Sequence, residues 1–81
     1  MIKSHIWDYQ MPQLKEQFGK RLQQLRTDAG LTQEQLAAKI DLSIESISNI
    51  ERGIHGPKFE NLEKIAKVLK IPVKEMFEFG K

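Results

Sequence analysis

The chain has 81 residues, of which 40% are hydrophobic and 30% are charged, and its formal net charge is +2. This length accommodates one domain, and the apolar content suffices for a small helical core without cross-links. The absence of cysteine excludes disulfides and thiolate metal sites, and the sequence contains neither an apolar run of membrane length nor the apolar centre of a signal peptide. We therefore expect a soluble protein of the reducing cytoplasm.

Residues 1–13 are expected to form an irregular arm. Their apolar side chains have neither helical nor alternating spacing, and Pro12 separates them from the next segment. Trp7 and Tyr9 either pack back on the domain, contact a partner subunit or reach DNA. The cost of exposing a lone tryptophan to water favours the first alternative.

A first long helix is predicted over residues 14–29. Pro12 precedes it and Gly30 closes it. Apolar residues recur every three or four positions and form one stripe: Leu14, Phe18, Leu22, Leu25 and Ala29. Arg26 lies at the edge of this stripe, about a quarter turn from its centre.

A second helix is predicted over residues 33–40. Thr32 and Gln35 have the spacing of a capping box, in which each side chain bonds to the backbone of the other residue. Asp41 stands where the chain must turn. Aspartate tolerates a left-handed backbone better than most residues, so the turn is compatible with it.

A third helix over residues 44–52 comes after the turn, with Ser43 as its N-cap and Gly53 after its end. At about 100° per residue, Ile47 and Ile50 point together into a core. The opposite face is polar and consists of Glu45, Ser48, Asn49 and Arg52. Such a face suits the reading of base edges in a major groove, but any surface helix also has a polar outer face.

The remaining chain predicts a loop over residues 53–57, a helix over residues 58–70 and a short helix over residues 73–77. Lys64, Lys67 and Lys70 are interpreted as a solvated face. Val73 and Phe77 are expected to close the core. Met76 and Phe79 then have no place in the predicted core. Together with Phe77 they form either a contact surface or part of a flexible tail.

Charge and residue content exclude two classes of function. A net charge of +2 is far below that of a protein that binds nucleic acid through charge alone, so any DNA contacts must be few and well placed. His5 and His55 are the only histidines, both in irregular segments, and no phosphate-binding loop accompanies them. We therefore expect no enzyme activity, no metal site and no cofactor.

Two short helices joined by so tight a turn form a helix-turn-helix pattern. Over residues 18–77 the sequence resembles the Xre and Cro-repressor type of helix-turn-helix protein. The resemblance rests on Leu25-Arg26, Gly30-Leu31-Thr32-Gln33, Leu36-Ala37, residues 46–53, Pro57 and residues 62–69. It implies an all-α, five-helix, lambda-repressor-like domain over residues 14–79, without small-molecule substrate or membrane contact.

The resemblance also implies roles for individual residues. Ile44 would contact a thymine methyl group, Glu45 a cytosine amino group and Asn49 an adenine. The full set of expected base contacts is Ser43, Ile44, Glu45, Ser48 and Asn49, and the expected phosphate contacts are Gln33, Ser46, Arg52 and Lys58. Arg26 and Glu51 would form a partly buried ion pair; the alternative is two unrelated surface charges.

The function implied by the resemblance is that of a transcriptional regulator, either a restriction-modification controller or a phage-type repressor. It would bind a short palindromic operator in double-stranded DNA as a homodimer. Met76, Phe77 and Phe79 are the residues predicted to form the dimer interface. The alternative is an antitoxin that holds a toxin partner and also binds its own promoter.

Overall fold

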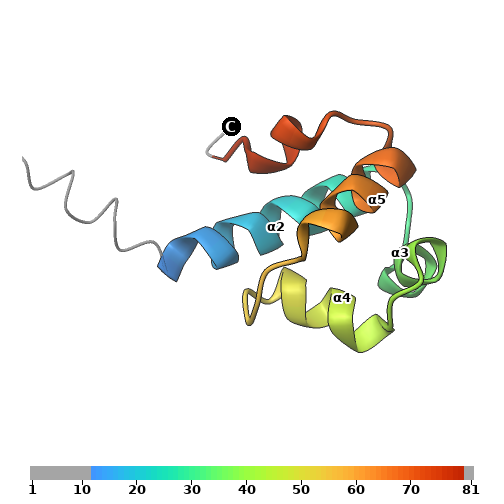
Figure 1. Ribbon diagram of the computed structural model, residues 1–81, viewed down its shortest axis with the longest axis horizontal. Helices are drawn as coiled ribbons and strands as arrows, with labels where there is room; N and C mark the ends of the chain where they lie inside the picture. The colour runs from blue at the N-terminus through green and yellow to red at the C-terminus, as the bar shows by residue number, and fades with distance from the viewer. Residues whose placement is uncertain (1–11, 80–81) are drawn as a thin grey trace, which may run out of the picture.

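The computed structural model describes residues 12–79. They form helices α2 (Pro12–Asp28), α3 (Gln33–Ile40), α4 (Ile44–Glu51) and α5 (Phe59–Leu69), followed by the 3-10 helix η1 (Val73–Phe77). The predicted all-α class is confirmed, although the fifth helix is a 3-10 helix (Figure 1). Trp7 and Tyr9 of the predicted arm lie outside the described residues.

The boundaries of α3 and η1 match the prediction, whereas those of α2, α4 and α5 differ from it by one or two residues. α2 begins at Pro12 and not at Leu14, because proline is well suited to the first turn of a helix. α4 ends at Glu51, with Arg52 as its C-cap. α5 begins at Phe59 after Lys58, which makes no side-chain capping bond. Within the described part of the chain, no helix is long and apolar enough to cross a membrane.

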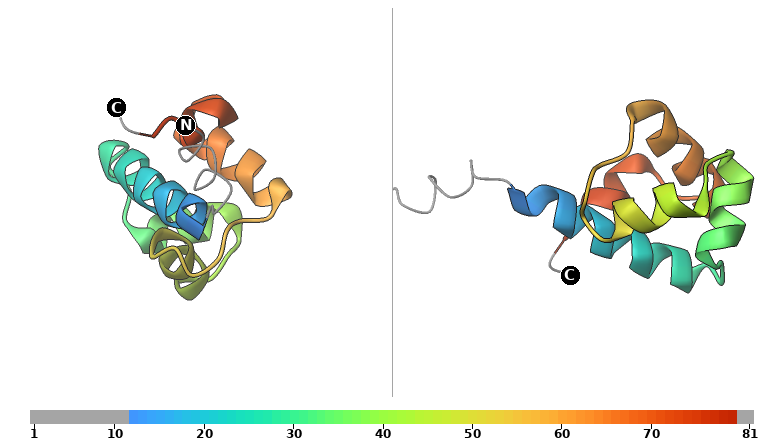
Figure 2. Two further views of the ribbon diagram at one scale, coloured as in Figure 1. Left: turned by 90° about the vertical axis from the view of Figure 1, so that its left-hand side faces the viewer. Right: turned by 90° about the horizontal axis from the view of Figure 1, so that it is seen from below.

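The helices are arranged around α2. α4 packs against α2 and α3, α5 packs against α3 and η1, and η1 returns to α2. Figures 1 and 2 show α4 on one side of α2 and η1 on the other. The core between them contains Phe18, Leu22, Leu36, Ala37, Ile40, Ile47, Ile50, Leu62, Ile65, Ala66, Leu69 and Met76. Only the middle of the predicted α2 stripe is buried, because Leu14 and Ala29 lie exposed near the two ends of the helix.

The predicted helix caps of α3 and α4 and the predicted turn between these helices are confirmed. The backbone N–H of Gln35 donates to Thr32 Oγ1 (3.0 Å), and the backbone N–H of Thr32 donates to Gln35 Oε1 (2.9 Å), which completes the capping box. Asp41 adopts the left-handed conformation with φ 61° and ψ 44°. The Ser43 side chain caps α4 by accepting from the backbone N–H of Ser46 at 3.0 Å.

The C-terminal assignment was wrong for Met76, Phe79 and Val73. Met76 is fully buried in the core of its own chain, Phe79 is partly buried against that core, and Val73 is about 37% exposed. Phe77 is about 40% exposed, but its ring lies 5.1 Å from that of the buried Phe18, so it covers the core in part. The prediction used α-helical spacing, but a 3-10 helix has three residues per turn, so residues four apart do not share a face. Arg21 Nε donates to the backbone oxygen of Glu75 (3.0 Å) and ties η1 to α2.

Gly19 allows the closest approach between α2 and α4. A Cβ atom at this position would lie 2.4 Å from the backbone oxygen of Ile50 and 2.5 Å from that of Glu51. Such contacts are far shorter than normal atomic contacts, so only glycine fits against the end of α4. The sequence analysis did not single out Gly19, because a glycine inside a helical pattern does not show which neighbour it meets.

We expect Gly19→Ala to lower the free energy of unfolding by about 1–3 kcal/mol, because the added methyl group pushes α2 away from α4. This loss opposes the gain of about 1 kcal/mol in helix propensity. Urea unfolding followed by circular dichroism measures the difference. Gly56→Ala is the matched control, since nothing lies within 4 Å of its added Cβ. Equal stability of the two variants would contradict the close packing.

Candidate nucleic-acid interface

α4 presents one face to the core and the other to solvent. Ile47 and Ile50 are 0% and 4% exposed, as the spacing predicted. Ile44, Glu45 and Arg52 are exposed on the outer side of the helix. Ser46, Ser48 and Asn49 are half-buried. α4 runs along one edge of the molecule in Figure 1, and Ile44 and Glu45 at its N-terminal end are exposed.

A buried ion pair holds the C-terminal end of α4. Arg26 Nε donates to Glu51 Oε2 at 2.6 Å, and Arg26 Nη2 donates to Glu51 Oε1 at 3.0 Å. The two side chains are only 8% and 3% exposed, which confirms the predicted pair and rejects two unrelated surface charges. Arg26 Nη1 also donates to the backbone oxygen of Leu31 (2.8 Å), so one side chain connects α2, the loop before α3 and α4.

The environment of Arg26 favours its charged form. The hydrogen bonds to Glu51 raise the pKa of Arg26 above its ordinary value, and they outweigh the opposing effect of burial. Because this pKa is raised, the stabilisation is fully present below the ordinary pKa of arginine and is lost only at still higher pH. Arg26 therefore remains charged throughout the neutral range.

The model of the helix-turn-helix family HTH_3 matches residues 22–76 of the chain, which include all of α3, α4 and α5. The chain belongs to this family. α3 and α4 are accordingly the two helices of the motif in this helix-turn-helix protein, and α4 is the second of them.

Similar members of the family are known. The control protein C.BamHI of Bacillus amyloliquefaciens is 38% identical over 63 residues, covering 76% of this chain and 78% of its own length. The control protein C.MunI of a Mycoplasma species is 41% identical over 68 residues, covering 83% and 92%. The crystal structure of the restriction-modification controller protein C.AhdI from Aeromonas hydrophila aligns with a TM-score of 0.74 and 38% identity, covering 78% and 96%.

Two shallow depressions bring predicted contact residues together in this helix-turn-helix protein. One is lined by residues 30–34 together with Arg26, Thr27 and Ile44, so Gln33 of α3 and Ile44 of α4 share it. The other is lined by Leu42, Ser46, Ile50, His55, Gly56, Pro57, Lys58 and Asn61. Ser46 and Lys58 therefore lie at one depression although twelve positions separate them in the sequence.

Gln33 has a partner that sequence reasoning missed. Its side-chain Nε2 donates to Glu51 Oε1 at 3.0 Å, and the residue is half-buried. No local pattern indicates this contact, because eighteen positions separate the two residues. On the outer face of α4, Arg52 Nη1 approaches Asn49 Oδ1 at 3.5 Å, which is too long for a strong hydrogen bond.

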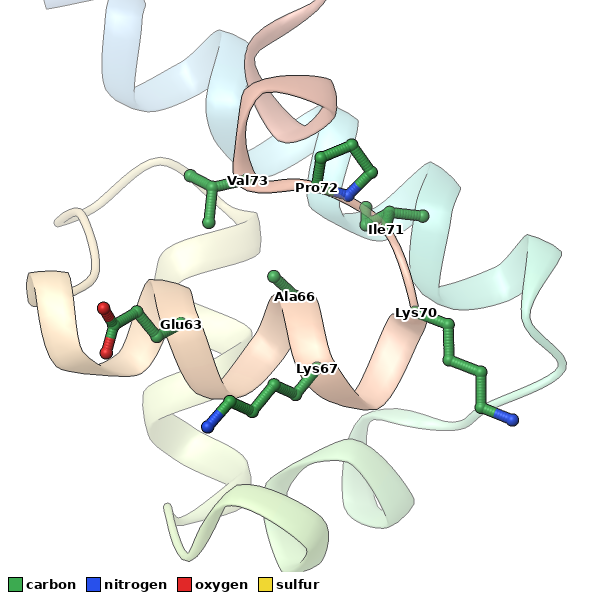
Figure 3. Close-up of a pocket in the computed structure, with 7 residues that line it drawn as sticks. All are labelled: Glu63, Ala66, Lys67, Lys70, Ile71, Pro72 and Val73. Carbon is green, nitrogen blue, oxygen red and sulfur yellow. The ribbon is translucent and has the colours of Figure 1, made fainter.

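A third groove lies between α5 and the segment that leads into η1 (Figure 3). Its lining consists of Glu63, Ala66, Lys67, Lys70, Ile71, Pro72 and Val73, and none of these belongs to α4. Lys64, Lys67 and Lys70 are all exposed, as expected of a solvated face. Across residues 12–79 no group of three or more His, Cys, Asp or Glu side chains forms a possible metal site.

The ion pair predicts a specific pattern of mutational effects. Glu51→Met alone should lower the free energy of unfolding by about 3–5 kcal/mol, because it leaves the Arg26 charge buried without a partner. Arg26→Met combined with Glu51→Met should restore most of that loss, since both charges are then gone. Urea unfolding of the single and double variants measures both effects. A single-variant loss below about 1 kcal/mol, the range of exposed pairs, would contradict the buried interaction.

Proposed function

We propose that this helix-turn-helix protein is a sequence-specific, DNA-binding transcriptional regulator that reads a short operator through α4. The observation that carries the proposal is the division of α4 into a buried face and a free face. Ile47 and Ile50 occupy the buried face. An accessible helix of eight residues fits the major groove, where base edges carry distinct donor and acceptor patterns. Such a regulator acts in the cytoplasm on double-stranded DNA and performs no catalysis.

The base contacts that we propose come from the N-terminal half and the outer face of α4. Ile44 is exposed and apolar, which suits contact with a thymine methyl group. Glu45 accepts from a cytosine amino group and Asn49 pairs with adenine. Ser43 and Ser48 complete the set. Ser43 has less freedom than the others, because its hydroxyl caps α4 and also donates to Ser46 Oγ (3.0 Å).

The proposed phosphate contacts are Gln33, Ser46, Arg52 and Lys58. Ser46 and Lys58 line the same depression, so we expect their phosphate contacts to be neighbours. Arg52 and Lys58 are exposed cations. With a net charge of only +2, this chain neutralises few phosphates, and its specificity must come mainly from α4.

Selection of bound duplexes from a random oligonucleotide pool tests the proposal. We expect recovery of a single short sequence with two-fold symmetry, bound at least about a thousandfold more tightly than unrelated duplex. Recovery of no preferred sequence would reject a regulator of this kind.

Two variants separate base reading from backbone contact. Asn49→Ala should weaken binding to the selected duplex by about 1–3 kcal/mol and relax the preference at one base pair. Arg52→Ala should weaken binding to all duplexes alike and lower the slope of log K against log salt by about 1. Fluorescence anisotropy at several salt concentrations measures both effects. Unchanged affinity in both variants would contradict the assignment of α4 as the reading helix.

We also propose that the regulator is a homodimer, since restriction-modification controllers are among its relatives and two copies match a palindromic site. An interface at the C-terminal end would use Phe77 and Phe79, whose rings lie 6.2 Å apart. Phe77 also lies 5.1 Å from the Phe18 ring. Met76 belongs to the core and is removed from the predicted interface.

Phe77→Asp should weaken dimerisation at least about tenfold, because it places a charge in an apolar contact. Analytical ultracentrifugation at micromolar concentrations measures the change. Phe59→Asp is the matched control, since Phe59 is 86% exposed at the start of α5 and is not part of the proposed interface. A larger effect from Phe59→Asp, or a wild-type monomer at all concentrations, would contradict this interface.

A further inference from the structure

The carboxylate of Glu51 accepts one more hydrogen bond than its ion pair requires. Arg26 alone supplies two donors, one to each oxygen, at 2.6 Å and 3.0 Å. This two-pronged contact is a complete arginine–carboxylate pair. Gln33 Nε2 adds a third donor, at 3.0 Å from Glu51 Oε1. The bond from Gln33 is therefore not needed for the ion pair between Arg26 and Glu51.

The extra bond fixes the side chain at the beginning of α3. Gln33 is the first residue of that helix, and its long side chain would otherwise sample many conformations. Ile44 shares a depression with it, but Ile44 is apolar and offers no hydrogen-bond partner. Glu51 is thus the residue that orients the Gln33 amide. The amide nitrogen carries two hydrogens, of which this bond uses one.

We propose that Glu51 is a positioning residue for the contact between Gln33 and the DNA backbone. By holding one N–H of the Gln33 amide, the carboxylate leaves the second N–H for a phosphate oxygen at the N-terminus of α3. This inference rests on the proposed function and deepens it. Its physical basis is preorganisation: the side-chain entropy of Gln33 is already lost before DNA binds, so less is lost on binding.

The electrostatics permit a carboxylate so close to a phosphate. Glu51 is 3% exposed, and the positive charge of Arg26 compensates it at hydrogen-bond distance. A phosphate therefore meets a neutral pair covered by an amide, and not a bare negative charge. Because Gln33 is itself uncharged, its contact releases no counterions and should leave the salt dependence of binding unchanged.

A mutant cycle on affinity for the selected duplex tests the proposal. Gln33→Ala should weaken binding about tenfold, the effect of losing a hydrogen bond to a charged group. Arg26→Met with Glu51→Met removes the carboxylate without leaving a buried charge, and we expect a loss of roughly threefold to tenfold. Adding Gln33→Ala to that variant should then cost less than about threefold, because the amide is no longer oriented.

Glu51→Asp provides a second test if the methionine variant does not fold, as judged by circular dichroism. It keeps the charge beside Arg26 but withdraws the carboxylate by one methylene from Gln33. Its affinity should fall severalfold, and Gln33→Ala should again cost less than in the wild type. Gln23→Ala, which removes an exposed glutamine on α2, is the matched control and should bind as the wild type does.

Discrimination at the base pair read by Asn49 separates positioning from mere structural support. It should stay unchanged in Glu51→Asp, since α4 itself remains in place. If discrimination falls together with affinity, or if the effects of Gln33 and Glu51 variants multiply independently, the proposal is overturned. The proposed function survives that result as long as Asn49→Ala still relaxes specificity, whereas a wild-type protein that selects no duplex overturns both.

Discussion

The contact between the end of α4 and the side of α2 is the constraint on which the rest of this structure depends. Gly19 brings the α2 backbone against the carbonyl oxygens of Ile50 and Glu51. Arg26 lies two turns further along α2 and binds the Glu51 carboxylate within the same contact between α2 and α4. Close packing and a buried charge pair thus act at one place, and both require the same separation and rotation of the two helices.

This constraint is what makes a free recognition helix possible. A helix of eight residues is marginal by itself in water, so α4 needs tertiary support. Ile47 and Ile50 provide it on the inner face, Ser43 at the beginning and Glu51 at the end. Because Ile47, Ile50 and Glu51 are buried on the inner side, the helix is held without Ile44 and Glu45, which remain exposed.

The network around Glu51 also connects stability with recognition. The same carboxylate contacts the long scaffold helix through Arg26 and the first helix of the motif through Gln33. A side chain expected to meet the DNA backbone is therefore attached to the core by a single hydrogen bond. In our proposal, rigidity built into the fold is used directly at the surface that binds DNA.

Local sequence determined the helices and their ends, because caps and apolar spacing act over a few residues. The Thr32–Gln35 capping box, the left-handed Asp41 and the inward Ile47 and Ile50 all result from such short-range rules. The Arg26–Glu51 pair was predictable only through the family resemblance, since twenty-five positions separate the two residues. The family resemblance predicted the pair, but it did not predict the hydrogen bond from Gln33 to Glu51.

Tertiary structure alone decided the remaining features. The burial of Met76 depends on how the last turn winds against α2, and a five-residue segment does not reveal whether it has three or 3.6 residues per turn. The Gln33–Glu51 bond and the contact at Gly19 depend on the distance between helices that are remote in sequence. The spacing of apolar residues along the chain specifies which face of a helix is apolar. Only the packed molecule specifies which residues of the other helices contact that face and its edges.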